Sequence, residues 1–250
     1  MASASQTAAV HKSPIFTGRN SLLDRYFYFA MSLVAAAIVV SGFSQTVNEK
    51  LFHPALAPPE ILWYHGAIFS AWIVFYILQT ALVRTRKVKW HRFLGWMGAG
   101  LAAVMVPLGV ATGIVMVHFE AYQLHEPGRY AFLAIPFFDI GSFAVCVALA
   151  IWWRKKPELH RRLIFFGTCA LLVAAFARID HAIVRQHSLQ YFCADLMIAL
   201  GLGRDLLVNR RVHAVYRVAL PVYFVMQLFV IYLSRIGPEW WLRIAHAIVG

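Results

Sequence analysis

Six ionisable residues lie inside long apolar stretches of this sequence, and they are the first candidates for chemistry. They are His65, Asp139, Arg178, Asp180, His181 and Asp195. A charged side chain in a lipid-facing helix costs about 2.5 to 3.5 kcal/mol on insertion scales, so such residues usually face a bundle interior or a cavity. Counted inward from the ends of their stretches, the six lie about 5 to 12 Å deep, at a helical rise of about 1.5 Å per residue. They therefore predict one polar layer that opens towards one side of a membrane.

His65 and His181 are the members of this layer that could bind a cofactor. Their imidazole nitrogens suit haem b or a divalent metal, and Asp139 or Asp180 would serve as an oxygen ligand or would orient an imidazole. No His-x-x-x-His, His-Glu-x-x-His or Cys-x-x-Cys spacing accompanies them. An imidazole hydrogen-bonded to a carboxylate inside a helix bundle explains the same residues without a cofactor.

The charged members of the layer are the candidate catalytic residues: Asp139, Arg178, Asp180 and Asp195. Arg178 keeps its charge at every physiological pH, so we expect it to pair with Asp139 or Asp195. Such a pair would serve a polar site, or it would simply hold neighbouring helices together.

Three further histidines follow short basic segments at the opposite ends of the apolar stretches. They are His91, His160 and His213, in KVKWHRFLGW, KPELHRRLIF and NRRVHAVYRV. The neighbouring arginines suit haem propionates, so two of these histidines are a second hypothesis for axial haem ligation. Topology and lipid contact explain histidines and arginines at a membrane surface equally well.

The composition assigns all these residues to a membrane protein. Of the 250 residues, 61% are hydrophobic and 14% are charged, against about half and about a quarter in soluble domains. An aromatic content of 15% excludes an intrinsically disordered chain. The 3 cysteines lie in apolar stretches, which excludes a disulfide scaffold. The net charge of +12 falls in short strips between those stretches, and this indicates topology signals and no nucleic-acid partner.

Seven segments approach the roughly 20 apolar residues that a helix needs to cross a bilayer. We expect them at residues 26–45, 61–83, 93–117, 131–153, 163–184, 191–208 and 218–234. The expected fold is an all-α bundle of about seven transmembrane helices, with the lipid bilayer as its main partner. After a solitary first helix, spans two and three, four and five, and six and seven would form three hairpins.

Basic residues decide the expected orientation. Sixteen of the 23 Lys and Arg residues lie in the N-terminal tail and in loops on one side, and six lie on the other. By the positive-inside rule, the N-terminus is expected in the cytoplasm and the C-terminus outside. The expected organisation is a cytoplasmic tail over residues 1–25, a seven-helix domain over 26–234 and an outer interfacial tail over 235–250.

Several segments resemble a widespread, uncharacterised family of bacterial multi-pass inner-membrane proteins with seven spans. The segments are WYHGAIFSAWIVFYILQTALV with HRFLGW, FLAIPFFDIGSFAVCVALAIWW with PELHRRLIFFGT, and AFARI. The resemblance covers roughly spans two to six and is carried by His65, Trp72, His91, Arg92, Gly95, Asp139, His160, Arg161, Arg162 and Arg178. It implies the bacterial inner membrane as the location. A weaker resemblance to b-type cytochrome membrane families implies haem held by histidines of neighbouring helices, although those families pair histidines deeper in the bundle.

Four functions are compatible with these residues. The first is an outward-facing His, Asp and Arg site that binds haem or a metal for a redox role. The alternatives are a metal-dependent membrane hydrolase or lipid-modifying enzyme, a proton-coupled transporter in which Asp and His form a relay, and a structural subunit that joins a membrane complex or a homo-oligomer. Whether the protein is an enzyme stays open at this stage.

Overall fold

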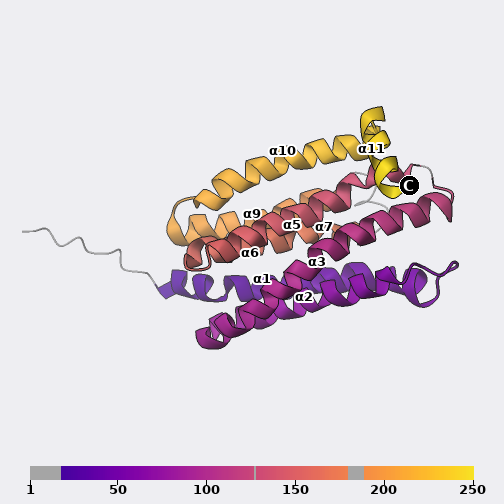
Figure 1. The fold of residues 1–250 in the computed structure, drawn as a ribbon. Coiled ribbons are helices and arrows are strands. Elements are labelled where there is room, and N and C mark those ends of the chain that lie inside the picture. Colours follow the sequence, from indigo (N-terminus) through magenta and orange to yellow (C-terminus); the bar gives the residue numbers. More distant parts are fainter. Residues whose placement is uncertain (1–17, 127, 180–188) are drawn as a thin grey trace, which may run out of the picture.

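The computed structural model describes residues 18–126, 128–179 and 189–250, and all regular structure in these ranges is helical. In chain order the elements are α1 (Gly18–Ser44), the π-helical turn η1 (Asn48–Phe52), α2 (Ile61–Arg84), α3 (Val88–Tyr122), α4 (Arg129–Phe132), α5 (Ala134–Trp152), α6 (Pro157–Leu171), α7 (Val173–Phe176), α9 (Leu189–Asn209), α10 (Ala214–Ile236) and α11 (Glu239–Val249). The long helices run side by side as a bundle, and α11 lies across one of its ends (Figure 1).

Two antiparallel helix pairs form the centre of the bundle. α2 packs along α3, and α5 packs along α6. α3 also contacts α5, which joins the two pairs, while α1 covers α2 and α10 lies against α5 (Figure 1). Spans two with three and four with five are thus directly packed partners.

α9 and α10 follow each other in the chain but pack on different neighbours. α9 contacts α6, α7 and α1, whereas α10 contacts chiefly α5 and α4. α9 is only partly exposed within the bundle: Arg204 and Asp205 are buried, and Leu196 and Leu200 are exposed. Its charged face is therefore shielded from lipid by the helices it packs on.

We refer to the two ends of the bundle as the N-terminal end and the α11 end. The start of α1 and the turns that join α2 to α3, α5 to α6 and α9 to α10 lie at the N-terminal end (Figure 1). α11 and α4 lie at the opposite end, where α11 contacts α4 and α3. Any polar side chain can thus be assigned to one end or to the bundle between them.

Among the described residues, 6 helical segments are long and apolar enough to cross a membrane. They are Leu22–Ser44, Ile61–Arg84, Val88–Tyr122, Arg129–Trp152, Pro157–Phe176 and Ala214–Ile236. The sixth expected span is also a helix, α9, but it carries Asp195, Arg204 and Asp205 and is not one of the 6. The chain therefore has the makeup of a multi-pass helical membrane protein.

Both expected tails contain helix. The chain is helical from Gly18, so part of the predicted N-terminal tail belongs to α1. At the other end, Gly237 takes a left-handed conformation with φ of 58° and ends α10, and Pro238 starts α11. The indole of Trp241 in α11 donates to the Ala131 carbonyl at 3.2 Å, which fixes α11 to α4.

Two glycines allow close helix contacts. A Cβ atom at Gly42 would lie 2.3 Å from the backbone oxygen of Ala175, and one at Gly201 would lie 2.2 Å from the Tyr216 hydroxyl. α1 therefore touches the backbone of α7, and the Tyr216 hydroxyl of α10 rests on α9.

Candidate functional site

The polar layer expected from the sequence divides into two groups, of which the first contains His65 and Arg178. The His65 ring stacks on Phe69 with ring centres 4.0 Å apart, and its Nδ1 is buried without a protein partner among the described residues. Arg178 acts electrostatically on His65. Its guanidinium lies 4.5 Å from the ring centre of Phe43 and donates to the Ala174 carbonyl.

The prediction that Arg178 forms an ion pair with Asp139 or Asp195 is wrong for the described part of the chain. Arg178 follows α7 and faces α1, and the carboxylate whose charge acts on it is Glu120 of α3. The two aspartates instead interact with Tyr223 of α10. The apolar stretches predicted depth along each helix, but the direction around the helix axis decides which side chains meet.

The second group contains Asp139 and Asp195 with three residues that the sequence interpretation missed. Asp139 of α5 is 8% exposed and interacts electrostatically with the phenols of Tyr191 and Tyr223. Asp195 of α9 acts electrostatically on the same Tyr223, and Gln227 of α10 acts on the Asp195 carboxyl group. The two carboxyl groups thus share a neighbour on α10.

Every member of the second group has a buried oxygen without a protein hydrogen-bond partner among the described residues. These oxygens belong to Asp139, Tyr191, Asp195, Tyr223 and Gln227. Buried polar atoms in folded proteins almost always have a protein or water partner, and an exception requires an explanation. The group therefore has the donor and acceptor capacity to hold water or a small polar ligand.

A pocket with a volume of about 250 Å³ lies beside this group at the α11 end. Its lining is Phe132, Ile135, Gln190, Tyr191, Ile231, Ser234 and Arg235. Tyr191 belongs both to the pocket wall and to the surroundings of Asp139. The pocket is thus connected to the buried carboxyl groups through one phenol.

Asp180 and His181 lie outside the described residues. The haem or metal site that would pair His65 with His181 therefore stays a prediction. Within residues 18–126, 128–179 and 189–250, no three His, Cys, Asp or Glu side chains come close enough to hold a metal ion together.

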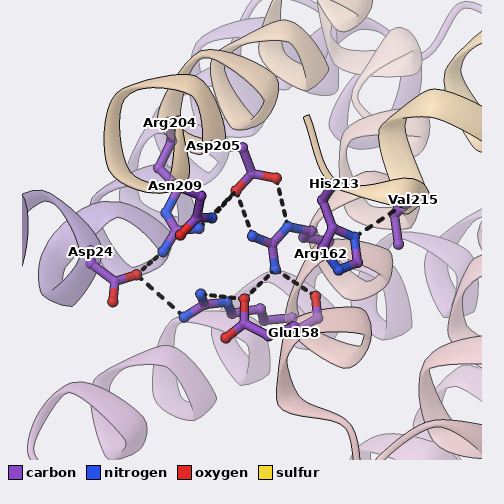
Figure 2. Close-up of polar contacts among 9 residues, drawn as sticks. Asp24, Glu158, Arg162, Arg204, Asp205, Asn209, His213 and Val215 are labelled. Atoms are coloured by element: carbon purple, nitrogen blue, oxygen red, sulfur yellow. Dashed lines mark hydrogen bonds and ion pairs between the residues drawn. The ribbon is translucent and has the colours of Figure 1, made fainter. Parts of the chain in front are cut away.

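An ionic network occupies the N-terminal end of the bundle (Figure 2). Arg162 of α6 and Asp205 of α9 are both 0% exposed. They form a two-pronged pair, from Nε to Oδ2 at 2.8 Å and from Nη2 to Oδ1 at 2.5 Å. Arg162 also donates to the Glu158 carboxylate at 2.6 Å, and Arg204 donates to Asp205 at 2.8 Å. Two-pronged geometry and additional donors are what a buried ion pair needs to offset its desolvation.

Asp24 extends this network to α1. Its carboxylate contacts Arg204, and it lies 3.4 Å from Nη1 of Arg161. Arg161 in turn donates to Glu158 at 2.8 Å. The network therefore ties α1, α6 and α9 together at one end of the bundle.

Sequence reasoning missed this network because it treated the basic residues near α6 as topology signals. Arg162 lies on the first turns of α6 after a run of basic loop residues, so nothing local distinguishes it from its exposed neighbours. The usable signal is the adjacent Arg204 and Asp205 inside a helix that is otherwise mostly apolar. Charges in such a position require partners, and α6 provides them.

A second pocket, with a volume of about 270 Å³, lies at this network. It is lined by Asp24, Glu158, Arg161, Arg162, Val208, Asn209, Arg211 and His213. His213 caps α10 by accepting a hydrogen bond from the Val215 N–H at 3.2 Å (Figure 2). Burial lowers the pKa of His213 below its usual 6.5, and the positive charge of Arg162 lowers the pKa further.

Buried tyrosines and a cysteine lie in the core of the bundle. Tyr223, Cys169 and Tyr216 belong to one buried cluster, and Tyr28 packs against it. Tyr76 of α2 is also buried. Tyr28 reaches the ionic network, because its phenol lies among the charges of Arg161, Arg162, Glu158 and Asp205.

We call this set of side chains the polar column. It consists of Tyr191, Asp139, Asp195, Gln227, Tyr223, Cys169, Tyr76, Tyr216 and Tyr28. The hydroxyls of all five tyrosines are buried without a protein hydrogen-bond partner among the described residues. Such a row of unpaired protic groups in an apolar bundle is costly, so it indicates a use for those groups.

Comparison of the chain with protein-family models, with curated proteins and with solved structures finds no match.

Proposed function

We propose that the protein moves protons across a membrane along the polar column. The single observation that carries the proposal is the set of buried, unpaired protic side chains in the core of a bundle that has a pocket at each end. Ionisable residues inside a membrane bundle commonly mark ion pathways and proton relays.

The residue types of the column suit proton transfer. A tyrosine hydroxyl both donates and accepts a hydrogen bond, and a carboxyl group can take up a proton on one oxygen and release it from the other. Asp139 and Asp195 would be the proton-carrying groups at the α11 end, with Tyr191 linking Asp139 to the pocket. Water bound to the unpaired oxygens would complete the hydrogen-bonded chain between them.

The ionic network would control the other end of the column. Arg162 and Arg204 are paired there with Glu158, Asp205 and Asp24, and these ion pairs close the end of the column. Glu158 accepts a hydrogen bond from Arg162 and lines the pocket, so it can exchange protons with the aqueous side.

We also infer that α9 is the seventh crossing and that the N-terminal end faces the cytoplasm of a bacterial inner membrane. The 21 residues of α9 span about 31 Å at about 1.5 Å per residue, which matches the thickness of the bilayer core. Its charges point to α1 and α6 and not to lipid. The excess of basic residues at the N-terminal end supports the orientation.

Proton flux into vesicles tests the proposed function. The purified protein is reconstituted into liposomes that contain a pH-sensitive dye, and a potassium gradient with valinomycin sets the driving potential. We expect proton entry that empty liposomes lack. We expect Asp139→Asn to lower the rate by about tenfold or more, which corresponds to an added barrier of at least about 1.4 kcal/mol.

The matched controls separate the column from general effects on the bundle. Tyr223→Phe removes a column hydroxyl of α10 and should lower the flux, whereas Tyr232→Phe removes an exposed hydroxyl of the same helix and should not. A flux equal to that of empty liposomes, or an Asp139→Asn flux equal to that of the unmodified protein, overturns the proposal. The first result would favour a structural subunit.

A further inference from the structure

We propose that His91 and His160 form a transition-metal site at the N-terminal end, bonding one metal through two neutral imidazoles. His91 lies on the first turn of α3 and His160 on the first turn of α6. Their ring centres are 6.1 Å apart with the ring planes at 74°. The polar column does not include either residue, so the proposal is independent of proton movement.

The ring separation matches that of two imidazoles that share one metal. A metal–nitrogen bond is about 2.0 to 2.1 Å long, and each nitrogen lies about 1.1 Å from its ring centre, so ligands on opposite sides of a metal have ring centres about 6.3 Å apart. The observed 6.1 Å is close to this value. A tetrahedral ion would draw the rings to about 5 Å, which makes two roughly opposed ligands the better fit.

A hydrogen bond fixes the protonation of His160 in the form that binds metal. Its Nδ1 lies 2.9 Å from the Ala150 carbonyl oxygen. A carbonyl can only accept, so Nδ1 carries a proton, and in the neutral ring Nε2 is the nitrogen with the lone pair. Metal-binding histidines are held by such carbonyl contacts, which orient the ring and set its tautomer.

His91 has an unused nitrogen in the same region. Its Nδ1 is buried and has no protein partner among the described residues. The backbone carbonyl of Gln79 lies within hydrogen-bonding reach of the same ring. The Gln79 side chain is 8% exposed, and both of its amide atoms are also without a protein partner among the described residues.

The surrounding charge indicates which form the metal takes. Arg92 acts electrostatically on His91, so a bare divalent cation meets positive charge there. A metal inside a negatively charged ligand such as a porphyrin does not. A bare copper ion and haem iron make the same bond to imidazole, and the experiment separates them.

The experiment measures metal and haem in the purified, full-length protein. Elemental analysis and titration with Cu²⁺ or Zn²⁺ detect a bare ion, and absorption spectra with and without added haem detect an imidazole-bound porphyrin. His160→Asn is the sharpest variant, because its amide can still donate to the Ala150 carbonyl but offers nothing in place of Nε2. His91→Asn tests the other ring, and His118→Asn changes an exposed histidine of α3 as the matched control.

We expect one metal centre per chain. Loss of a residue that only hydrogen-bonds a metal ligand lowers metal affinity by about 10- to 100-fold, so loss of a ligand in His160→Asn or His91→Asn should lower it at least as much. His118→Asn should bind normally. A haem spectrum that depends on both histidines, or a bare ion that depends on both, supports the site and identifies its occupant. Absence of any metal or haem binding, or binding that all three variants retain, overturns it. Gel filtration confirms that each variant is folded.

Discussion

At the scale of single residues, the most consequential contact is the ion pair between Arg162 and Asp205. Both side chains are 0% exposed, and both oxygens of the carboxylate are engaged by the guanidinium. Two charges removed from water gain from each other only when the geometry is good and the remaining donors are satisfied. Glu158 and Arg204 supply that satisfaction, so the pair depends on its whole surroundings.

Arg162→Met should destabilise the protein. Breaking a buried pair costs about 3 to 5 kcal/mol because it leaves a buried charge without compensation. We expect the lower part of that range, because Arg204 still donates to Asp205 at 2.8 Å. Thermal unfolding of the purified protein in detergent measures the loss.

A double variant checks this interpretation. Arg162→Met with Asp205→Leu replaces the pair by apolar side chains, and Arg204 retains its contact with Asp24. Replacing both partners is often neutral or stabilising, so the double variant should be more stable than Arg162→Met. If the double variant instead loses as much stability as Arg162→Met and Asp205→Leu lose separately, breaking the pair is not the source of the destabilisation.

Residue depth was predictable from the sequence and residue partners were not. The apolar stretches indicated that His65, Asp139 and Asp195 lie inside the bundle. They did not indicate that Arg178 faces Phe43, because successive residues of a helix point about 100° apart and depth alone does not fix the direction of a side chain. Tyrosines such as Tyr223 were also overlooked, since a tyrosine in an apolar helix resembles an ordinary packing residue until its hydroxyl is found without a partner.

At the scale of helices, the cap at the start of α10 makes the stability of the protein depend on pH. The Nδ1 of His213 accepts the Val215 N–H, which requires the neutral ring. Burial and the charge of Arg162 lower the pKa of His213 in the folded protein. The unfolded chain then takes up the proton at a higher pH than the folded chain does.

This difference predicts how stability depends on pH. The contribution of the cap is fully present above about pH 6.5, the pKa of an unperturbed histidine, and is lost as the pH falls towards the lower folded pKa. His213→Asn keeps a capping oxygen that does not titrate. Melting temperatures measured between about pH 7.5 and about pH 5 should fall less in His213→Asn than in the unmodified protein. Equal pH dependence would assign the loss to other groups.

Helix positions followed from the sequence more closely than helix packing did. Apolar length located the long helices, including α10, which was expected at residues 218–234 and spans Ala214–Ile236. The neighbours of α9 were not predictable, because they depend on Arg162 lying level with Asp205 across two helices that are 43 residues apart in the chain. Local patterns contain no information on such a pairing.

At the scale of the whole molecule, the inferred seven crossings put the two ends of the bundle on opposite sides of the membrane. Cysteines at exposed positions test this with a maleimide that does not cross membranes. Glu126→Cys and Glu239→Cys at the α11 end should be labelled in intact cells stripped of their outer membrane. Lys155→Cys and Arg210→Cys at the N-terminal end should be labelled only after the cells are opened.

Arg210 is the decisive position. Because α9 ends just before it, protection at Arg210 together with protection at Lys155 requires α9 to cross the membrane. Labelling of Arg210→Cys in closed cells, with Lys155→Cys still protected, would leave six crossings. If only Lys155→Cys and Arg210→Cys are labelled in closed cells, the orientation is the opposite of the one inferred.

The ion pair that closes the N-terminal end also bears on how the chain is synthesised. Each charged residue adds to the cost of inserting a helix into the bilayer, and α9 carries three of them. α6 precedes α9 in the chain, so Arg162 is already in the membrane when Asp205 arrives. We expect α9 to enter the bilayer against α6 rather than as an independent insertion signal, which makes the order of synthesis part of what allows this sequence to fold.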